Sequence, residues 1–515
     1  MSARLGRAGA ALSLTLLIAA QAAAAPPQPP AGGTAAKGAF PRQRAERVLR
    51  RAEGLAAGKG ARRADLTAAL MRLLRAYPAL GEAGRARADA LLARPTDRPD
   101  PAGNPWSAPE AAASPACTAH FCVHWVDTSE DAPSLRDANG ISDGDGVPDY
   151  VELNQSAAEH VYAVENRRLG WRPPKPDGGR GGPGGATDIY ISDIGGLGLF
   201  GYAAPDPGQT SAGHRFRRSL FAYLVMDDDY SRRQFPGTTQ AGDLEVTLAH
   251  EYNHVLQFAY DAFQDLWMAE STAVWMEDQV YDDINDYLRY MRRWARRLTV
   301  PLTANSIKVY GSAVWNHWLQ RRYGADLIRK AWAGALKARP ATFSVAAYDR
   351  AIRKAGSSDF GLDFARFSAD AVEWRTDTAF AEGSSYPDLA RRGRLRFGSD
   401  MTRRLNHTTF IPLSIHPAAG RAIRLRAAVP HGTAAAIALV GRIGSERQGR
   451  TISRIDFSPG GGALSAVLAR PRRFERITAV LINADTSQRG FSARKLDWRY
   501  TDNHIPFEVR ATLLR

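Results

Sequence analysis

The stretch "EVTLAHEYNHVLQFAYD" at residues 245–261 constrains the fold most, because it places two histidines and a glutamate inside an amphipathic pattern. Apolar side chains recur at spacings of four, seven and four residues, at Leu244, Leu248, Val255 and Ala259. This spacing predicts one helix over residues 243–261. Asp243 would stand at its N-cap or in its first turn, where an acidic side chain is favoured. The fold must therefore enclose the apolar side of this helix.

The polar residues of this helix suit a metal site. His250 and His254 lie one turn apart, so their imidazoles project from the same side and can bind one zinc ion. Glu251 projects about 100° further round the helix. That is too far for a third ligand, but it suits a base that acts on metal-activated water. The alternative is a helix whose two half-buried histidines are held by hydrogen bonds alone.

A catalytic zinc site needs a third protein ligand and one open position. One class of zinc peptidase has a glycine three residues after the second histidine and a third histidine ligand three residues beyond it. This class is excluded, because Gln257 and Tyr260 stand at those two positions. The following stretch "DLWMAESTAVWMED" offers two glutamates instead, seven residues apart on one face. We expect Glu270 to be the ligand, since the chain before it has room for a turn and a returning helix. Glu277 is the alternative ligand; otherwise it accepts a histidine N–H or is solvated.

These segments resemble the gluzincin zinc metallopeptidases, which are thermolysin-like in the broad sense. The stretch "HEYNHVLQ" followed by "WMAESTAVWME" is closest to bacterial exported forms, and "DGDGVPDYVELNQSAAEHVY" looks like the opening of an exported metalloprotease family. The resemblance spans about residues 117–325 and implies that Glu270 is the third zinc ligand. The chain differs from thermolysin at Ala269 and Val274, where thermolysin has Asn and Asp.

The resemblance also implies a mechanism. Zinc lowers the pKa of its bound water to about 7, and Glu251 would take the proton and deliver it to the leaving amine. The segment "SIKVYGSAVWNHWLQRRYG" is similar to a recurring "Y…L…RYG" segment of such peptidases, which favours Tyr310 as the donor to the oxyanion. The alternative for Tyr310 is a packing role. His317 lies between two tryptophans and is typical of a packed or surface histidine.

The N-terminus predicts an export signal over residues 1–25. Arg4 and Arg7 precede the apolar stretch "AGAALSLTLLIAA", and small residues near Ala23–Ala25 suit cleavage. The apolar stretch is short for a membrane span, although an uncleaved anchor is the alternative. No later segment has about eighteen apolar residues in a row, so we expect no stable span after signal removal and a secreted or periplasmic protein.

Cys117 and Cys122 are the two cysteines of the chain. A close pair in an exported protein predicts one disulfide. A four-sulfur metal site is excluded, because no second pair exists to complete it.

The stretch "DANGISDGDGVPDYVE" concentrates oxygen ligands at Asp143, Asp145, Asp149 and Glu152. Glycines permit tight turns there and a helix follows, so the stretch resembles a calcium loop of the EF-hand or thrombospondin-repeat kind. The match is partial, because Ile141 stands where an EF-hand has an acid. The alternative is a polar turn that caps the helix.

The pattern along the chain predicts an α+β fold in three parts after the signal. Residues 26–115 would be a helical N-terminal segment with a Pro-rich linker, and its position suggests a propeptide or an accessory segment. Residues 116–385 would be a zincin-like catalytic domain with a mixed sheet, an active-site helix and a helical lobe. Residues 386–515 predict an all-β sandwich. Its expected short strands are "TTFIPLSIHP", "AIRLRAAVP", "AAAIALVGRI", "RITAVLINAD" and "ARKLDWRYTD", which are separated by turn residues.

The net charge of +15 does not by itself indicate a nucleic-acid partner, because no nucleic-acid-binding fingerprint is present. The glycine-rich stretch "KPDGGRGGPGGATD" lacks the P-loop lysine pattern, and no G-x-S-x-G elbow supports serine hydrolysis.

The sequence therefore predicts an exported zinc endopeptidase that acts on a peptide or protein substrate and holds Zn²⁺, with Ca²⁺ as a second candidate ion. An aminopeptidase is less favoured, because its usual Gly-x-Met-Glu-Asn segment is not apparent. The alternative from another class is a non-catalytic exported binding or surface protein with a structural or vestigial metal site. The oligomeric state stays open.

Overall fold

Three helices open the part of the chain that the computed structural model describes. The described residues are 41–59, 65–97, 106, 114–133, 144–206, 219–237, 239–337, 344–376, 379–492, 497–500 and 503–515. The signal and linker predictions for residues 1–40 lie outside them. The helices are α1 (Arg42–Ala56), α2 (Leu66–Ala76) and α3 (Glu82–Leu91), as the periodicity predicts. None of the helices in the described ranges is long and apolar enough to cross a membrane.

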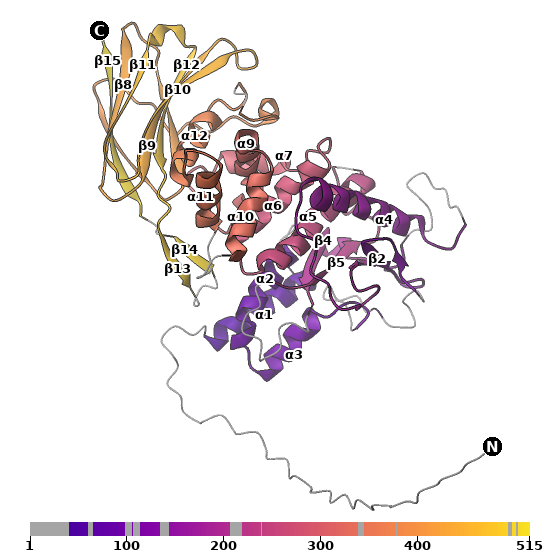
Figure 1. Ribbon diagram of the computed structural model, residues 1–515. Helices are drawn as coiled ribbons and strands as arrows, with labels where there is room; N and C mark the ends of the chain where they lie inside the picture. Colours follow the sequence, from indigo (N-terminus) through magenta and orange to yellow (C-terminus); the bar gives the residue numbers. More distant parts are fainter. Residues whose placement is uncertain are drawn as a thin grey trace, which may run out of the picture. The chain divides into compact units, whose positions relative to one another are not determined.

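Helix α2 is the buried member of this group (Figure 1). It begins after Asp65, whose Oδ1 accepts a hydrogen bond of 2.8 Å from the N–H of Ala68 and so caps the helix. Helix α1 buries one face through small and apolar side chains at helical spacing, Ala45, Leu49, Ala52 and Ala56. Helix α2 contacts α1 and also strand β4 (Gly201–Pro205) of the central sheet.

The central sheet has five strands in the order β1-β2-β3-β5-β4. Its strands are β1 (Ala116–Cys117), β2 (Phe121–His124), β3 (Thr187–Ser192), β4 (Gly201–Pro205) and β5 (Ala222–Asp227). Strands β2, β3 and β5 are parallel, and the edge strands β1 and β4 are antiparallel to their neighbours. The sheet is therefore mixed, as predicted. Cys117 pairs with Cys122 across β1 and β2, and the two form the predicted disulfide.

Helices pack around this sheet and form a lobe after it. The first three are α4 (Asp149–Tyr162), α5 (Gln240–Asp261) and α6 (Leu266–Val280). The lobe contains α7 (Leu288–Ala295), α8 (Lys308–Gly311), α9 (Ala313–Tyr323), α10 (Asp326–Lys337), α11 (Ser344–Ala355) and α12 (Phe360–Ala371). A π-helical turn follows α4 at Ala163–Arg168, and 3₁₀ turns lie at Tyr77–Ala79, Gly195–Leu197, Gly383–Ser385 and Pro471–Arg473. Helix α5 contacts β4, β5, α4 and α6, so the helix predicted to carry the metal site lies at the centre of the fold.

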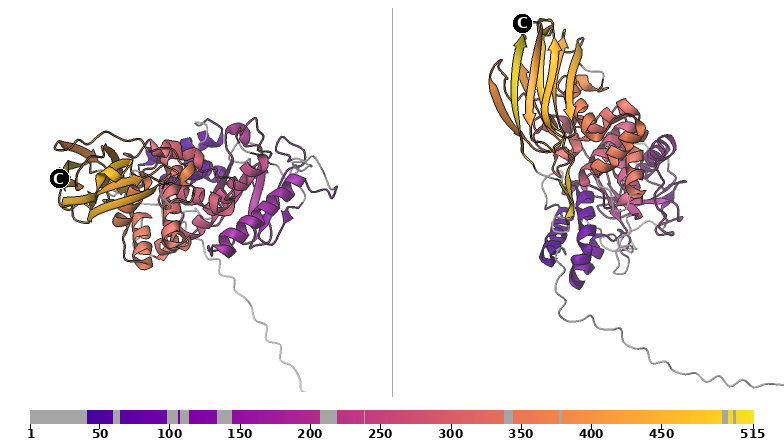
Figure 2. Two further views of the ribbon diagram at one scale, coloured as in Figure 1. Left: turned by 90° about the horizontal axis from the view of Figure 1, so that it is seen from above. Right: turned by 60° about the vertical axis from the view of Figure 1, so that its left-hand side comes forward.

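The C-terminal strands form two four-stranded antiparallel sheets, drawn in orange and yellow in Figures 1 and 2. The strands are β6 (Asp400–Leu405), β7 (Thr409–Ile415), β8 (Ala422–Val429), β9 (Ala435–Ile443), β10 (Arg450–Ser458), β11 (Gly462–Ala469), β12 (Arg476–Asn483) and β15 (Ile505–Leu514). The sheet orders are β10-β9-β12-β7 and β11-β8-β15-β6, and β13 (Gln488–Ser492) pairs separately with β14 (Asp497–Tyr500). The predicted C-terminal antiparallel region is confirmed, but the sequence analysis missed five of its strands, β6, β10, β11, β13 and β15.

The core of the sandwich explains the sequence of its strands. Leu425, Leu439 and Phe507 lie among the apolar residues between the two sheets. Strands β9 and β12 are buried on both faces, because α12 packs against the outer face of their sheet. Their sequences are therefore continuously apolar. Strands β8, β11 and β15 have one face toward solvent and alternate.

Arg94 anchors the end of the N-terminal segment to the sheet. Its guanidinium is buried and forms ion pairs with three carboxylates, at 2.5 Å to Asp177, 2.6 Å to Asp188 and 2.7 Å to Asp206. The hydroxyl of Tyr223 also donates to the carbonyl of Ala93, at 2.7 Å. Breaking one side of a buried ion pair typically costs about 3–5 kcal/mol, so residues around Arg94 belong structurally to the sheet.

Candidate metal centre

Helix α5 begins three residues earlier than the apolar spacing predicts. Thr239 is the N-cap, since its Oγ1 accepts a hydrogen bond of 2.9 Å from the N–H of Gly242. Asp243 therefore lies in the first turn and is not the cap, which settles the two positions that the sequence left open for it. Almost all of α5 from Gly242 onward is buried, because the sheet, α4 and α6 enclose it.

Helix α6 returns antiparallel to α5 after the four residues 262–265. Gln257 contacts Ala269, His254 lies opposite Glu270, and His250 lies opposite Glu277. The residue numbers fall along α5 as they rise along α6, which is the pattern of an antiparallel pair. The short connection thus carries Glu270 back to the histidines, as the spacing of the sequence suggests.

The three expected ligands converge. Nε2 of His250 and Nε2 of His254 are 3.1 Å apart, and Oε2 of Glu270 lies 3.5 Å from the first and 3.6 Å from the second. Zinc bonds of about 2.0–2.1 Å in a tetrahedron separate neighbouring ligand atoms by about 3.3 Å. The three distances fit this separation, so the side chains match the ligand set and the size of a zinc site.

The charges of the cluster also call for a cation. Glu270 is fully buried, and neither of its carboxylate oxygens has a hydrogen-bond partner among the described residues. Its charge faces the two imidazole Nε2 atoms at 3.5 and 3.6 Å, and a buried carboxylate needs such positive partners or a metal ion. Burial opposes its charged form, but the imidazoles of His254 and His250 hold the pKa of Glu270 below its usual range. Burial likewise opposes the imidazolium of His250, while Glu270 and Glu277 raise its pKa well above the usual value.

Hydrogen bonds orient both imidazoles. Nδ1 of His250 lies 2.6 Å from Oε1 of Glu277, and Nδ1 of His254 lies 2.9 Å from Oε1 of Gln257. Because these oxygens can only accept, each Nδ1 carries the proton and each Nε2 faces Glu270. Glu277 thus lies where the second of the roles that the sequence left open for it requires, as an acceptor for a histidine N–H.

The partners of His254 continue as a chain that the sequence analysis missed. The amide of Gln257 donates to Oδ1 of Asn253 at 2.7 Å and to the carbonyl of Ala269 at 3.0 Å. Asn253 in turn donates to Oε2 of Glu165 at 2.8 Å, and burial raises the pKa of Glu165 well above its usual value. Glu165 lies in the π-helical turn after α4. The signal in the sequence was the pair of amides within an otherwise apolar helix.

We expect Glu277→Gln to lower zinc affinity by about 10–100-fold, the usual effect of removing a carboxylate that orients a ligand histidine. Competition with a chromogenic chelator measures the affinity. Asp278→Asn is the matched control, because the same change one residue later leaves the contact with His250 intact. An equal effect of both substitutions would contradict the orienting role of Glu277.

A cavity of about 110 Å³ opens beside the cluster. His250, Glu251 and Tyr310 are among its lining residues, together with Arg289 and Tyr290. Glu251 is buried on the side of α5 next to the ligands, where the helical position of a base predicts it. The hydroxyl of Tyr310 faces the same space from α8.

Close packing of α7 and α8 positions Tyr310. A Cβ at Gly311 would lie 2.8 Å from Cβ of Trp294, so only glycine allows this approach. The ring of Tyr310 stacks on that of Tyr290 with a centroid separation of 5.1 Å. Lys308, two residues earlier, is buried with its ammonium 5.1 Å above the Trp294 ring, where it donates to the carbonyl of Val300.

Lys308→Met should stabilise the protein at neutral and acid pH. Burial lowers the pKa of Lys308 from 10.5 to about 7. Between these values the unfolded chain binds a proton that the native chain lacks, so wild-type stability rises with pH. Below pH ~7 the variant should gain on the order of a few kcal/mol in free energy of unfolding. Loss of the hydrogen bond to the Val300 carbonyl should reduce this gain by about 1 kcal/mol. It should fade as the pH approaches 10.5. Urea unfolding measures it, and the exposed Lys330→Met should show no such trend.

Two residues of the N-terminal segment also reach the site. Oγ1 of Thr67 donates to Oε2 of Glu251 at 2.9 Å. Oδ2 of Asp65 accepts from the hydroxyl of Tyr310 at 2.9 Å, and Asp65 lines the cavity. Burial, and then the negative charges of Glu270 and Glu251, raise the pKa of Asp65 to about 7. No motif in the sequence links these residues to the helix that they contact.

The remaining candidates are placed as follows. Asp143 lies outside the described residues. Oδ1 of Asp145 accepts from the N–H of Val147 at 2.8 Å, as in a polar turn, and Asp149 begins α4 two residues later. Calcium binding by Asp143, Asp145, Asp149 and Glu152 stays a prediction. His317 is a packed histidine that stacks on Tyr287 at 4.6 Å, and burial lowers its pKa to about 3.

Residues 235–390 match the model of a family described as a family of unknown function, DUF6055. The match includes helices α5 to α12, and so both histidines, Glu251, Glu270 and Tyr310. The N-terminal helices and the sandwich lie outside it. No curated protein and no solved structure matches the chain.

Proposed function

We propose that this chain is an exported zinc metallopeptidase that hydrolyses peptide bonds within a peptide or protein substrate. The observation that carries the proposal is the convergence of His250, His254 and Glu270 beside a cavity that Glu251 lines. Three protein ligands with a neighbouring cavity are typical of a catalytic zinc site, whereas structural sites usually close with four. This difference favours the enzyme over a non-catalytic binding protein.

When bound, zinc would polarise a peptide carbonyl and lower the pKa of a coordinated water to about 7. Glu251 is placed to take a proton from the attacking water and to deliver it to the leaving amine, a role typically worth about 10²–10⁴ in rate. Glu251 is among the residues that line the cavity, where substrate would enter.

Tyr310 is the candidate donor to the carbonyl oxygen as that oxygen becomes negative. Burial and the neighbouring Asp65 raise the pKa of Tyr310 well above its usual value, so the hydroxyl keeps its proton and can donate. Loss of one such donor typically reduces the rate by about 10²–10³.

The test measures zinc and hydrolysis together. Zinc per chain is determined by mass spectrometry, and digestion of a fluorescein-labelled unfolded protein is followed before and after chelation and re-addition of zinc. Because Asp65 contacts Tyr310, the full-length chain is compared with the same chain carrying Asp65→Asn. We expect about one zinc per chain. At least one of the two chains should hydrolyse the labelled protein, and this hydrolysis should be lost on chelation and restored by zinc.

Two outcomes would contradict the proposal. Hydrolysis that survives metal removal would exclude the zinc mechanism. Stoichiometric zinc with hydrolysis by neither chain, even after limited proteolysis has removed helices α1 and α2, would favour the non-catalytic alternative.

A further inference from the structure

The side chains that the proposed chemistry needs are already engaged by the N-terminal segment. Oγ1 of Thr67 donates to Glu251 at 2.9 Å, and Thr67 is fully buried. Oδ2 of Asp65 receives the hydroxyl hydrogen of Tyr310 at 2.9 Å. The candidate base and the candidate oxyanion donor therefore both point at α2, where a substrate would have to be.

Thr67 also occupies the edge of the sheet. Strand β4 pairs with β5 on one side only, and the N–H of Ala203 in β4 donates to Oγ1 of Thr67 at 2.9 Å. Unpaired N–H groups on an edge strand are where an extended peptide can add as a further strand. One hydroxyl thus bridges the strand edge and the base, two groups that a peptide substrate would contact together.

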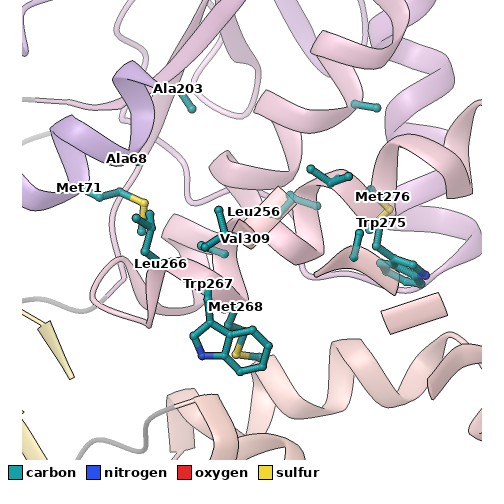
Figure 3. Close-up of a cluster of buried hydrophobic side chains, with 14 of the residues drawn as sticks. Ala68, Met71, Ala203, Leu256, Leu266, Trp267, Met268, Trp275, Met276 and Val309 are labelled. Atoms are coloured by element: carbon teal, nitrogen blue, oxygen red, sulfur yellow. The ribbon is translucent and has the colours of Figure 1, made fainter. Parts of the chain in front are cut away.

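Helix α2 is held firmly in this position. Figure 3 shows Ala68 and Met71 of α2 in one buried cluster with Leu266 and Val309 of the catalytic part. Arg75, at the other end of α2, donates to the carbonyl of Gln264 in the connection between α5 and α6. The contacts of Asp65 and Thr67 are therefore part of a docked interface along the whole helix.

We propose that helices α1 and α2 hold the site latent, with Asp65 and Thr67 seated in the place of a peptide substrate. This inference rests on the proposed function. The carboxylate of Asp65 is of the kind that zinc binds, and it lines the open side of the site. Displacement of α1 and α2 would free Glu251, Tyr310 and the edge of β4.

The structure also indicates which part of the segment has to leave. Arg94 and its three carboxylate partners are buried beside the sheet. Loss of α1 and α2 alone would clear the cavity and leave this ion-pair network in place. The activating displacement therefore concerns residues up to Ala76, the end of α2.

Two substitutions weaken the contacts with little change of shape. Asp65→Asn keeps an N-cap of similar quality for α2 but removes the charge at the site. Thr67→Val keeps the branched shape and removes both hydrogen bonds. Asp359→Asn is the matched control. Oδ1 of Asp359 caps α12 in the same way, by accepting a hydrogen bond of 2.8 Å from the N–H of Leu362. Helix α12 contacts the sandwich.

The experiment uses the full-length chain loaded with Co²⁺ in place of zinc, and its readout is the visible absorption spectrum. Acetohydroxamic acid, a small metal-binding probe, is titrated into the wild type, the Asp65→Asn/Thr67→Val double variant, and Asp359→Asn. We expect the double variant to respond at a concentration at least tenfold lower than the other two. Thr67→Val alone, which leaves the cap of α2 intact, should shift the response in the same direction.

The outcomes separate the two proposals. Stoichiometric Co²⁺ with equal probe affinity in all chains would overturn the latency and leave the proposed peptidase standing. Failure of every chain, wild type included, to bind Co²⁺ would overturn both. The Co²⁺ spectrum of each variant also reports whether its metal site has folded. If the double variant is misfolded, the probe affinity of Thr67→Val alone tests the latency.

Discussion

Glu251→Gln should reduce the rate at which an unfolded protein is hydrolysed by about 10²–10⁴-fold, the usual contribution of a general base. Bound zinc should stay unchanged, because Glu251 is not among the three side chains whose ligand atoms converge. The amide has nearly the shape of the carboxylate, and its oxygen can still accept the hydrogen bond from Thr67. It has no basic oxygen that can take a proton, so the change isolates proton transfer from packing and metal binding.

Glu245→Gln is the matched control for this substitution. Glu245 lies six residues earlier on the same helix and is not among the residues that line the cavity. Its rate should stay within about twofold of wild type, since changes away from buried or functional features usually have small effects. Both substitutions are made in the wild-type chain and in the chain carrying Asp65→Asn. Hydrolysis that is equally fast with Glu251→Gln and Glu245→Gln would remove Glu251 from the mechanism.

The local geometry of the site follows from the sequence because helix geometry is fixed. A spacing of four residues places two side chains on one side of any α-helix, and the structure indeed brings Nε2 of His250 to 3.1 Å from Nε2 of His254. Glu270 could be expected from chain length, since a turn and a returning helix restrict where it can lie. These arguments need no knowledge of the rest of the fold.

The contacts from the N-terminal segment could not be predicted in this way. Thr67 precedes Glu251 by 184 residues, and the docking of α2 depends on apolar packing that any of several amphipathic helices could offer. The relay from Glu165 through Asn253 had a weak signal, because asparagine and glutamine in a buried helix must find partners. The identity of those partners depends on how α4 packs against α5.

Two of the strands that the sequence did not predict share a physical cause. Strands β6 and β10 are edge strands of the sandwich, and edges carry charged and polar side chains that weaken the apolar signal. Strand β10, for example, has no buried residue. The interior strands β9 and β12 were found because both faces are covered, which makes them apolar throughout. Strand β15 alternates clearly between buried and exposed residues, so its sequence pattern was sufficient to predict it.

Zinc should stabilise the wild-type chain against unfolding and should stabilise Glu270→Gln much less at the same concentration. Zinc at about 1,000 times its Kd adds about 4 kcal/mol to the native state. Glutamine keeps the volume of the side chain but removes the negative charge that faces both imidazoles, 3.5 and 3.6 Å from their Nε2 atoms. Loss of this contact should lower affinity by more than the roughly 10–100-fold typical of an outer partner.

The measurement is the midpoint of thermal unfolding with and without zinc, for the wild type, Glu277→Gln and Glu270→Gln. A graded series is expected, because Glu277 contacts only Nδ1 of His250 whereas Glu270 faces the Nε2 atoms of both histidines. The zinc-dependent shift should be largest in the wild type, smaller in Glu277→Gln and smallest in Glu270→Gln. An undiminished shift in Glu270→Gln would place the metal elsewhere, since a cation held between these imidazoles cannot avoid a carboxylate that lies this close to both.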